Sequence, residues 1–208
     1  MIIEHTMTGK FITLEGMDGA GKSTHIPYII ALLQAQGHEV VSTREPGGTN
    51  LGERLRELVL HETMQVETET LLMFAARKEH IECVIKPALA RGAYVLSDRF
   101  TDATYAYQCG AKGLNANKIE ALEQWVQGEF QPDLTLLFDV PVEVSVERLR
   151  AARSPDKFER ENAAFFSRIR LAYLQRASAN PNRFRVIDAN KPLDEVAKTV
   201  ERIMLSLW

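Results

Sequence analysis

The sequence has no large excess of charge of one sign, no long apolar run and only two cysteines, and each of these features excludes a class of function. The chain has 25 basic and 28 acidic residues among 208, so its net charge of -3 gives no broad attraction for DNA, RNA or acidic membranes. No apolar run approaches the ~20 residues that a membrane-spanning helix needs. Any polyanionic ligand must therefore be bound at a local site.

The two cysteines, Cys83 and Cys109, are too few for a disulfide framework and lack the spacing of metal ligands. Reduced thiols are typical of a cytoplasmic protein, and the first ten residues lack the apolar core of a signal peptide. We interpret residues 1–8 as an N-terminal extension. The length predicts a single domain over residues 1–208.

Short apolar runs alternate with longer segments of helical periodicity. Strands are predicted over 11–14, 38–43, 94–97, 134–138 and 184–187. Helices are predicted over 22–36, 51–60, 67–91, 115–129, 142–152, 161–177 and 193–207. Gly37 is expected to stop the first helix, Pro87 to kink the third and Asn115 to cap the fourth. This alternation predicts an α/β fold with a five-stranded parallel sheet and helices on both faces.

The strongest motif lies between the first strand and the first helix, where GMDGAGKS (16–23) matches G-x-x-x-x-G-K-[ST]. Its glycines let backbone N–H groups surround a phosphate, and the following helix adds its positive end. Lys22 would reach the β- and γ-phosphates of ATP, and Ser23 would offer its hydroxyl to Mg²⁺. The predicted nucleotide-binding residues are Gly16, Met17, Asp18, Gly19, Ala20, Gly21, Lys22, Ser23 and Thr24.

Two further segments follow predicted strands and therefore lie on the same edge of the sheet as this loop. Asp98 and Arg99 follow the third strand, where a carboxylate can organise Mg²⁺ and an arginine can hold a phosphate with a fork of N–H donors. Arg44 opens the loop REPGGT (44–49) after the second strand and faces the same crevice. Taken alone, each segment is also compatible with a surface ion pair or an ordinary turn.

Four segments, in this order, resemble bacterial thymidylate kinases. They are MDGAGKS (17–23), REPGGT (44–49), LLMFAAR (71–77) and DRFTDATYAYQ (98–108), and together they span much of the chain. The resemblance implies a three-layer P-loop kinase fold that transfers the γ-phosphoryl of ATP to dTMP with Mg²⁺. It also implies a homodimer.

The resemblance assigns the sugar and the phosphate of dTMP to four residues. Asp18 would contact the 3′-hydroxyl, and Tyr107 would pack beside the sugar, where it disfavours a 2′-hydroxyl. Arg44 and Arg99 would hold the phosphate.

The thymine base is assigned to a second group. Arg77 would hydrogen-bond its edge, Thr104 and Gln108 would help to read it, and Arg56 would support the pocket. Many family members place a stacking aromatic residue four positions before the arginine.

In this chain that stacking position is Met73, and Phe74 follows it. We favour Phe74, because an aromatic face suits a pyrimidine, although a thioether can also stack. Both side chains are alternatively interpreted as simple core residues.

Cations crowd residues 148–160, which we interpret as a lid over ATP. Members of the resembling family place a catalytic arginine either in the phosphate loop or in the lid, and Gly19 occupies the loop position here. The resemblance therefore implies a lid arginine, with Arg153 favoured over Arg148 and Arg150 the least favoured. With Lys22, Asp98, Arg99 and Mg²⁺ it would offset the repulsion between two polyanions.

Two other functions remain open from the sequence. One is a deoxynucleoside kinase or a different nucleoside-monophosphate kinase, and the other is a P-loop ATPase switch that controls a protein partner. Two arginines directed at an acceptor phosphate favour a monophosphate acceptor. No pattern typical of a switch protein accompanies the phosphate loop.

Overall fold

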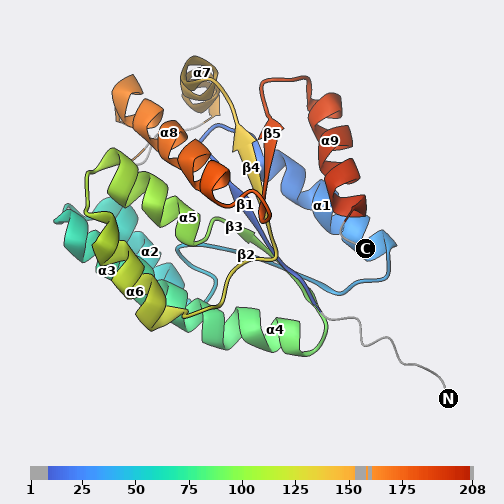
Figure 1. The fold of residues 1–208 in the computed structure, drawn as a ribbon, viewed down its shortest axis with the longest axis horizontal. Helices are drawn as coiled ribbons and strands as arrows, with labels where there is room; N and C mark the ends of the chain where they lie inside the picture. Colours follow the sequence, from blue (N-terminus) through green and yellow to red (C-terminus); the bar gives the residue numbers. More distant parts are fainter. Residues whose placement is uncertain (1–8, 153–157, 159–160, 207–208) are drawn as a thin grey trace.

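The computed structural model describes residues 9–152, 158 and 161–206, and it contains a five-stranded parallel sheet (Figure 1). The strand order is β2-β3-β1-β4-β5. The central strand, β1 (Phe11–Glu15), pairs with β3 (Tyr94–Asp98) and β4 (Leu134–Asp139). β2 (Val40–Arg44) and β5 (Phe184–Asp188) form the edges. The predicted sheet is confirmed.

Helices cover both faces of this sheet. α1 (Lys22–Ala35) and α9 (Leu193–Leu205) lie together on one side (Figure 1). The other helical segments are α2 (Asn50–His61), α3 (Val66–His80), η1 (Ile81–Ile85), α4 (Lys86–Ala90), α5 (Thr101–Thr104), η2 (Tyr105–Ala111), α6 (Ala116–Val126), α7 (Val142–Ala152) and α8 (Ala163–Ala179). No helix in the described part of the chain is long and apolar enough to cross a lipid bilayer.

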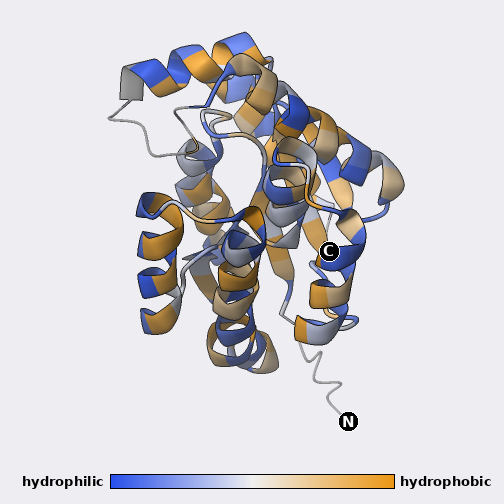
Figure 2. Ribbon diagram, turned by 90° about the vertical axis from the view of Figure 1, so that its left-hand side faces the viewer, coloured by the Kyte–Doolittle hydropathy of each residue, from blue (hydrophilic) through white to orange (hydrophobic). Residues whose placement is uncertain are grey.

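The two faces of β1 contribute to different parts of the core. Leu14 belongs to the same buried cluster as Ile29 and Leu33 of α1, whereas Phe11 packs in a second cluster with Ile81 of η1. Many helices carry both hydrophilic and hydrophobic bands (Figure 2). Burying one large aliphatic side chain contributes about 1.5–3 kcal/mol, so this packing holds the centre of the sheet rigidly.

The predicted helix over 67–91 is three segments in the structure. α3 leads into the π-helical η1, and α4 follows with Pro87 in its first turn. Proline lacks an N–H and its ring crowds the preceding turn, so the wider π turn accommodates it. The predicted stop at Gly37, with φ 85°, and the cap at Asn115 are confirmed. Residues 101–111, which the apolar pattern left unassigned, form α5 and η2.

All five strands end in charged side chains at one edge of the sheet. The registers place Arg44 beside Asp98 and Asp139 beside Asp188. Glu15 ends β1 and leads directly into the glycine-rich loop. The carboxyl edge therefore gathers the charged groups that the sequence pattern predicts there.

Candidate active site

The glycine-rich loop is preformed between β1 and α1. Gly16 has φ 136°, and a Cβ on it would lie 2.5 Å from the carbonyl oxygen of Phe138, so no side chain fits there. Lys22 spans the loop, donating from Nζ to the carbonyls of Gly16 at 2.9 Å and Met17 at 3.0 Å. Burial and the nearby charge of Arg99 lower the pKa of Lys22. An anion in the loop would favour the charged amine.

Helix α7 packs directly on this loop. Ser145 donates from Oγ to the carbonyl oxygen of Asp18 at 2.5 Å. Gly19 has φ 77°, and a Cβ on it would lie 2.6 Å from the Ser145 carbonyl oxygen and 3.1 Å from Cγ of Leu149. The loop therefore has no room for an arginine side chain at position 19 in this arrangement.

The predicted lid arginines lie in different places. Arg148 lines the cavity above the glycine-rich loop and donates to the carbonyl oxygen of Ala189 at 3.1 Å. Arg150 lies in a separate groove beside Ala163. Arg153 and most of the predicted lid, residues 153–157 and 159–160, lie outside the described residues.

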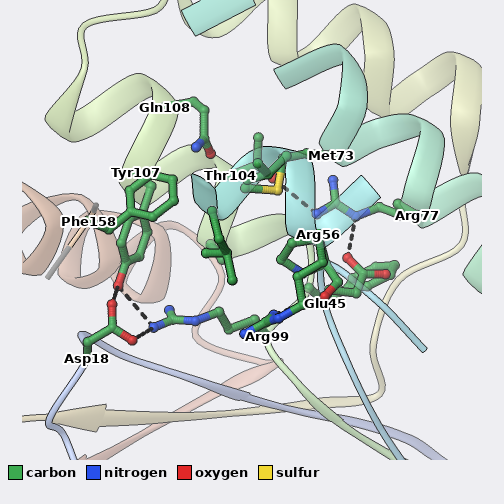
Figure 3. Close-up of a pocket in the computed structure, with 15 residues that line it drawn as sticks. Asp18, Glu45, Arg56, Met73, Arg77, Arg99, Thr104, Tyr107, Gln108 and Phe158 are labelled. Atoms are coloured by element: carbon green, nitrogen blue, oxygen red, sulfur yellow. Dashed lines mark hydrogen bonds and ion pairs between the residues drawn. The ribbon is translucent and has the colours of Figure 1, made fainter. Parts of the chain in front are cut away.

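Two cavities open at the carboxyl edge and share side chains. The loop cavity is lined by Gly19, Gly21, Lys22, Ser23, Thr24, Arg44, Asp98, Arg148 and Leu149. The inner cavity is lined by Pro46, Val59, Leu60, Met73, Arg77, Phe100, Ala103, Thr104, Tyr107, Gln108 and Phe158 (Figure 3). Asp18, Glu45, Arg56 and Arg99 line both. A molecule in the inner cavity would thus lie next to one bound at the glycine-rich loop.

Asp18, Arg99 and Tyr107 form a closed cluster at the junction of the cavities (Figure 3). Arg99 donates from Nη2 to Asp18 at 2.7 Å and to the Tyr107 hydroxyl at 3.0 Å, and that hydroxyl donates to the other Asp18 oxygen at 2.7 Å. Burial disfavours the Asp18 carboxylate, but the charges of Arg99 and Lys22 outweigh it and lower its pKa to about 2. Asp18 is therefore an ionised acceptor at neutral pH.

Two more arginines, Arg44 and Arg56, line the loop cavity with Arg99. Arg44 forms a forked ion pair with Glu53, at 2.7 and 3.3 Å, and Arg56 donates from Nη1 to the carbonyl oxygen of Pro46 at 3.0 Å. Burial and the charges of Arg44 and Arg99 lower the pKa of Arg56. The junction therefore brings three arginines close together, and a phosphate dianion would relieve their mutual repulsion.

Arg77 is buried in the wall of the inner cavity, with 2% of its surface exposed. It donates from Nε to Glu45 at 2.8 Å and from Nη2 to Thr104 at 3.0 Å, while Nη1 has no partner among the described residues. Gln108 donates from Nε2 to Glu69 at 2.9 Å, and its Oε1 likewise has no partner within that part of the chain. Two buried atoms of the cavity wall, a donor and an acceptor, therefore lack a hydrogen-bond partner within the described residues.

The chain matches one family closely in comparisons with known proteins. A sequence model of the family described as thymidylate kinase matches residues 14–200. The chain belongs to the thymidylate kinase family. Thymidylate kinase from Methylobacillus flagellatus is 70% identical over 95% of this chain and 98% of its own length. That from Cupriavidus metallidurans is 61% identical over 97% of this chain and 100% of its own length.

A crystal structure of thymidylate kinase from Ehrlichia chaffeensis has the same fold. It superposes with a TM-score of 0.77 and 32% identity, covering 94% of this chain and 98% of that chain. The predicted family, its P-loop kinase fold and the phosphotransferase class are confirmed.

The two candidate stacking residues, Met73 and Phe74, lie in different places, and the position of Phe74 does not support the preference for it. Met73 lines the inner cavity and Phe74 does not. Phe74 is 1% exposed and packs with Tyr105, and its ring centroid lies 4.7 Å from Cζ of Arg77. Adjacent positions on a helix point ~100° apart, so only one of the two can face the cavity fully. In this chain, Phe74 therefore packs against the guanidinium of Arg77 within the core.

Phe158 is a cavity residue that the sequence analysis missed. It is 6% exposed, and its ring lies perpendicular to Tyr107 with centroids 5.8 Å apart. The Nζ atom of Lys112 lies 4.5 Å from the Phe158 centroid. The available signal was that Phe158 is the single aromatic residue of the cationic segment 148–160.

Glu15 and Tyr173 were also missed, although both support Arg99. Arg99 has φ 71°, a conformation that costs a non-glycine residue on the order of 1–2 kcal/mol. The buried Glu15 accepts from the next backbone N–H, that of Phe100, at 2.7 Å and from the Tyr173 hydroxyl at 2.8 Å. Tyr173 in turn accepts from Nη1 of Arg99 at 3.0 Å. Burial, aided by the charge of Asp102, raises the pKa of Glu15 to about 8.

Proposed function

We propose that the chain transfers the γ-phosphoryl of ATP to dTMP, giving dTDP and ADP on the route to dTTP. The observation that carries this proposal is the junction of the two cavities at Asp18, Arg56 and Arg99. ATP would bind at residues 16–24, and dTMP would fill the inner cavity with its phosphate at the junction. The acceptor phosphate is itself the nucleophile, so the protein needs no strong base.

The unused polar atoms of the inner cavity support a thymine acceptor. Glu69 offers carboxylate oxygens to Gln108, so the amide nitrogen faces Glu69 and Oε1 remains for the base. The C4 carbonyl of thymine would accept from Nη1 of Arg77, and its N3–H would donate to Gln108. Cytosine presents a donor and an acceptor in the reverse order and would leave both groups unpaired.

The remaining contacts fit the sugar and the phosphate. Ionised Asp18 would accept from the 3′-hydroxyl, and the buried Tyr107 would oppose a 2′-hydroxyl. Arg44 and Arg99 would hold the phosphate, and we place Arg56 with them, although the resemblance assigned it to the base pocket, because a dianion relieves the mutual repulsion of the three arginines. Thr104 would keep Arg77 in place.

The base would lie between two cavity walls. Met73 is positioned to pack against it, and Phe158 would cover the cavity beside Tyr107. Closure of this cover would limit transfer to water.

Mg²⁺ fits the residues at the loop cavity. Asp98 has a buried carboxylate oxygen, Oδ1, with no partner among the described residues, and Ser23 lines the same cavity with its hydroxyl. Oxygen donors of this kind suit Mg²⁺ together with phosphate oxygens and water. When bound, the ion would neutralise charge on the transferred phosphoryl group. Lys22, Arg99 and Arg148, or Arg153 of the lid, would supply the remaining positive charge.

We further propose that the protein is a cytoplasmic homodimer. Leu71 on α3 is 53% exposed and Trp125 on α6 is 82% exposed, and they line one groove with Phe74 and Leu122. A second copy of the chain would bury this apolar surface.

Steady-state assays with ATP and Mg²⁺ test the proposed reaction. We expect dTMP to be the best acceptor among dTMP, dUMP, dCMP and thymidine. A faster reaction with thymidine would identify a deoxynucleoside kinase instead. ATP hydrolysis without transfer to any of the four would favour a P-loop ATPase.

A further inference from the structure

A buried histidine lies one step behind the arginine of the inner cavity. His80 is fully buried, three residues after Arg77 on α3, and does not line the cavity. The carboxylate of Glu45 joins them, accepting from Nε of Arg77 at 2.8 Å and contacting Nδ1 of His80 at 2.9 Å. Because a carboxylate only accepts, Nδ1 of His80 carries the hydrogen. His80 thus donates to Oε1 of Glu45, the carboxylate oxygen that Arg77 does not bind.

His80 is itself held on its far side by the loop 45–49 and by β2. Its Nε2 lies 2.7 Å from Oγ1 of Thr43. Gly48 has φ 79°, and a Cβ on it would lie 2.5 Å from Cδ2 and 2.6 Å from Nε2 of His80. The glycine therefore makes room for the ring, which is enclosed by Gly48, Thr43 and Glu45.

This chain of contacts determines which part of Arg77 faces a ligand. Glu45 holds Nε and Thr104 holds Nη2, so the guanidinium plane is fixed and Nη1 alone remains unused within the described structure. Without His80, Oε1 of Glu45, a residue that is only 4% exposed, would lose its hydrogen bond from Nδ1 of the imidazole. Glu45 would then rotate or admit water, and Arg77 would lose its fixed orientation.

We propose that His80 is a positioning residue for base recognition: acting through Glu45, it directs Arg77 at the C4 oxygen of the acceptor pyrimidine. This inference rests on the proposed function. It assigns selectivity to a side chain that touches neither substrate. If His80 had only a structural role, its replacement would lower the stability of the protein without changing how kcat/KM responds to replacement of the C4 oxygen.

The test pairs a variant with a substrate analogue. 4-Thio-dTMP replaces the C4 oxygen by sulfur, a weaker acceptor, and keeps the N3–H. The quantity measured is the ratio of kcat/KM for dTMP to kcat/KM for 4-thio-dTMP. We expect the wild type to favour dTMP about 10-fold, as for loss of one hydrogen bond to a charged donor. His80→Leu is expected to bring the ratio within about twofold of unity, chiefly through a higher KM for dTMP.

Two variants serve as controls. His80→Asn retains an N–H donor near the place of Nδ1, so it is expected to restore most of the wild-type ratio. His25→Leu removes another buried imidazole, one that stacks on Phe138 at 5.4 Å and does not contact Arg77, so it should leave the ratio unchanged.

The outcomes separate this inference from the proposed function. If the wild type does not phosphorylate dTMP, the proposed function fails. If it does, but folded His80→Leu keeps the wild-type ratio or His25→Leu lowers it equally, the positioning role is refuted. A thermal unfolding curve establishes that each variant is folded.

Discussion

Replacing Asp18 by asparagine tests the cluster at the cavity junction in two independent ways. The substitution keeps the size of the side chain and removes the charge that faces Arg99 at 2.7 Å. The pKa of Asp18 falls from its ordinary value of 3.8 to about 2 in the folded protein, which corresponds to about 2 kcal/mol of stability. Because the folded-state pKa is the lower one, this stability is present above about pH 4 and is lost between about pH 4 and 2.

Urea unfolding measures the first effect. At pH 7 we expect Asp18→Asn to be less stable than the wild type by about 2 kcal/mol, and the difference should shrink as the pH falls below about 4. Wild-type stability in the variant at pH 7, or a difference that persists unchanged at pH 3, would refute the ion-pair reasoning.

Kinetics measure the second effect. Loss of an ionised acceptor for the 3′-hydroxyl should reduce kcat/KM for dTMP by about 10–100-fold, as for a hydrogen bond to a charged group. The reduction should be much smaller for 3′-deoxy-dTMP, which lacks that hydroxyl. An equal loss with both acceptors would mean that Asp18 does not contact the sugar.

Three further substitutions test other parts of the account. Gly19→Ala adds a Cβ that would lie 2.6 Å from the Ser145 carbonyl oxygen, so it should displace α7 and Arg148 and lower kcat at least about 10-fold. An unchanged kcat in steady-state assays would contradict this packing argument. Glu15→Gln removes a carboxyl whose pKa is raised to about 8, so the free energy of unfolding, measured with urea, should fall less between about pH 4.5 and 8 in the variant than in the wild type. Parallel pH profiles of the two proteins would exclude Glu15 as the source of that fall. Trp125→Glu places a charge at the most exposed apolar residue of the α3–α6 groove, so sedimentation should detect monomers where the wild type forms dimers, and an unaltered dimer would place the interface elsewhere.

The sequence predicts those features that depend on local pattern. Arg44 and Asp98 end strands, the glycine-rich loop and Arg99 follow strands, and parallel strands bring their carboxyl ends to one edge. The positions of Met73 and Phe74 depend on the rotation of α3 about its axis, which local periodicity does not fix closely enough to distinguish adjacent residues.

Contacts between distant segments escape sequence reasoning for a different reason. Tyr173 meets Glu15 across 158 positions of the chain, and Arg77 meets Glu45 across 32. No periodicity links such residues, because their proximity arises from the packing of α8 and α3 around the sheet. These buried partners hold the arginines that the sequence motifs identify.

The central claim is that Arg77 and Gln108 read the base of a deoxynucleoside monophosphate. It is tested most directly by the ratio of kcat/KM for dTMP to that for dCMP with ATP and Mg²⁺. Cytosine reverses both hydrogen-bonding groups, at a cost of about 1–3 kcal/mol each, so we predict a preference for dTMP of at least about 30-fold. Comparable values for the two acceptors would contradict the account.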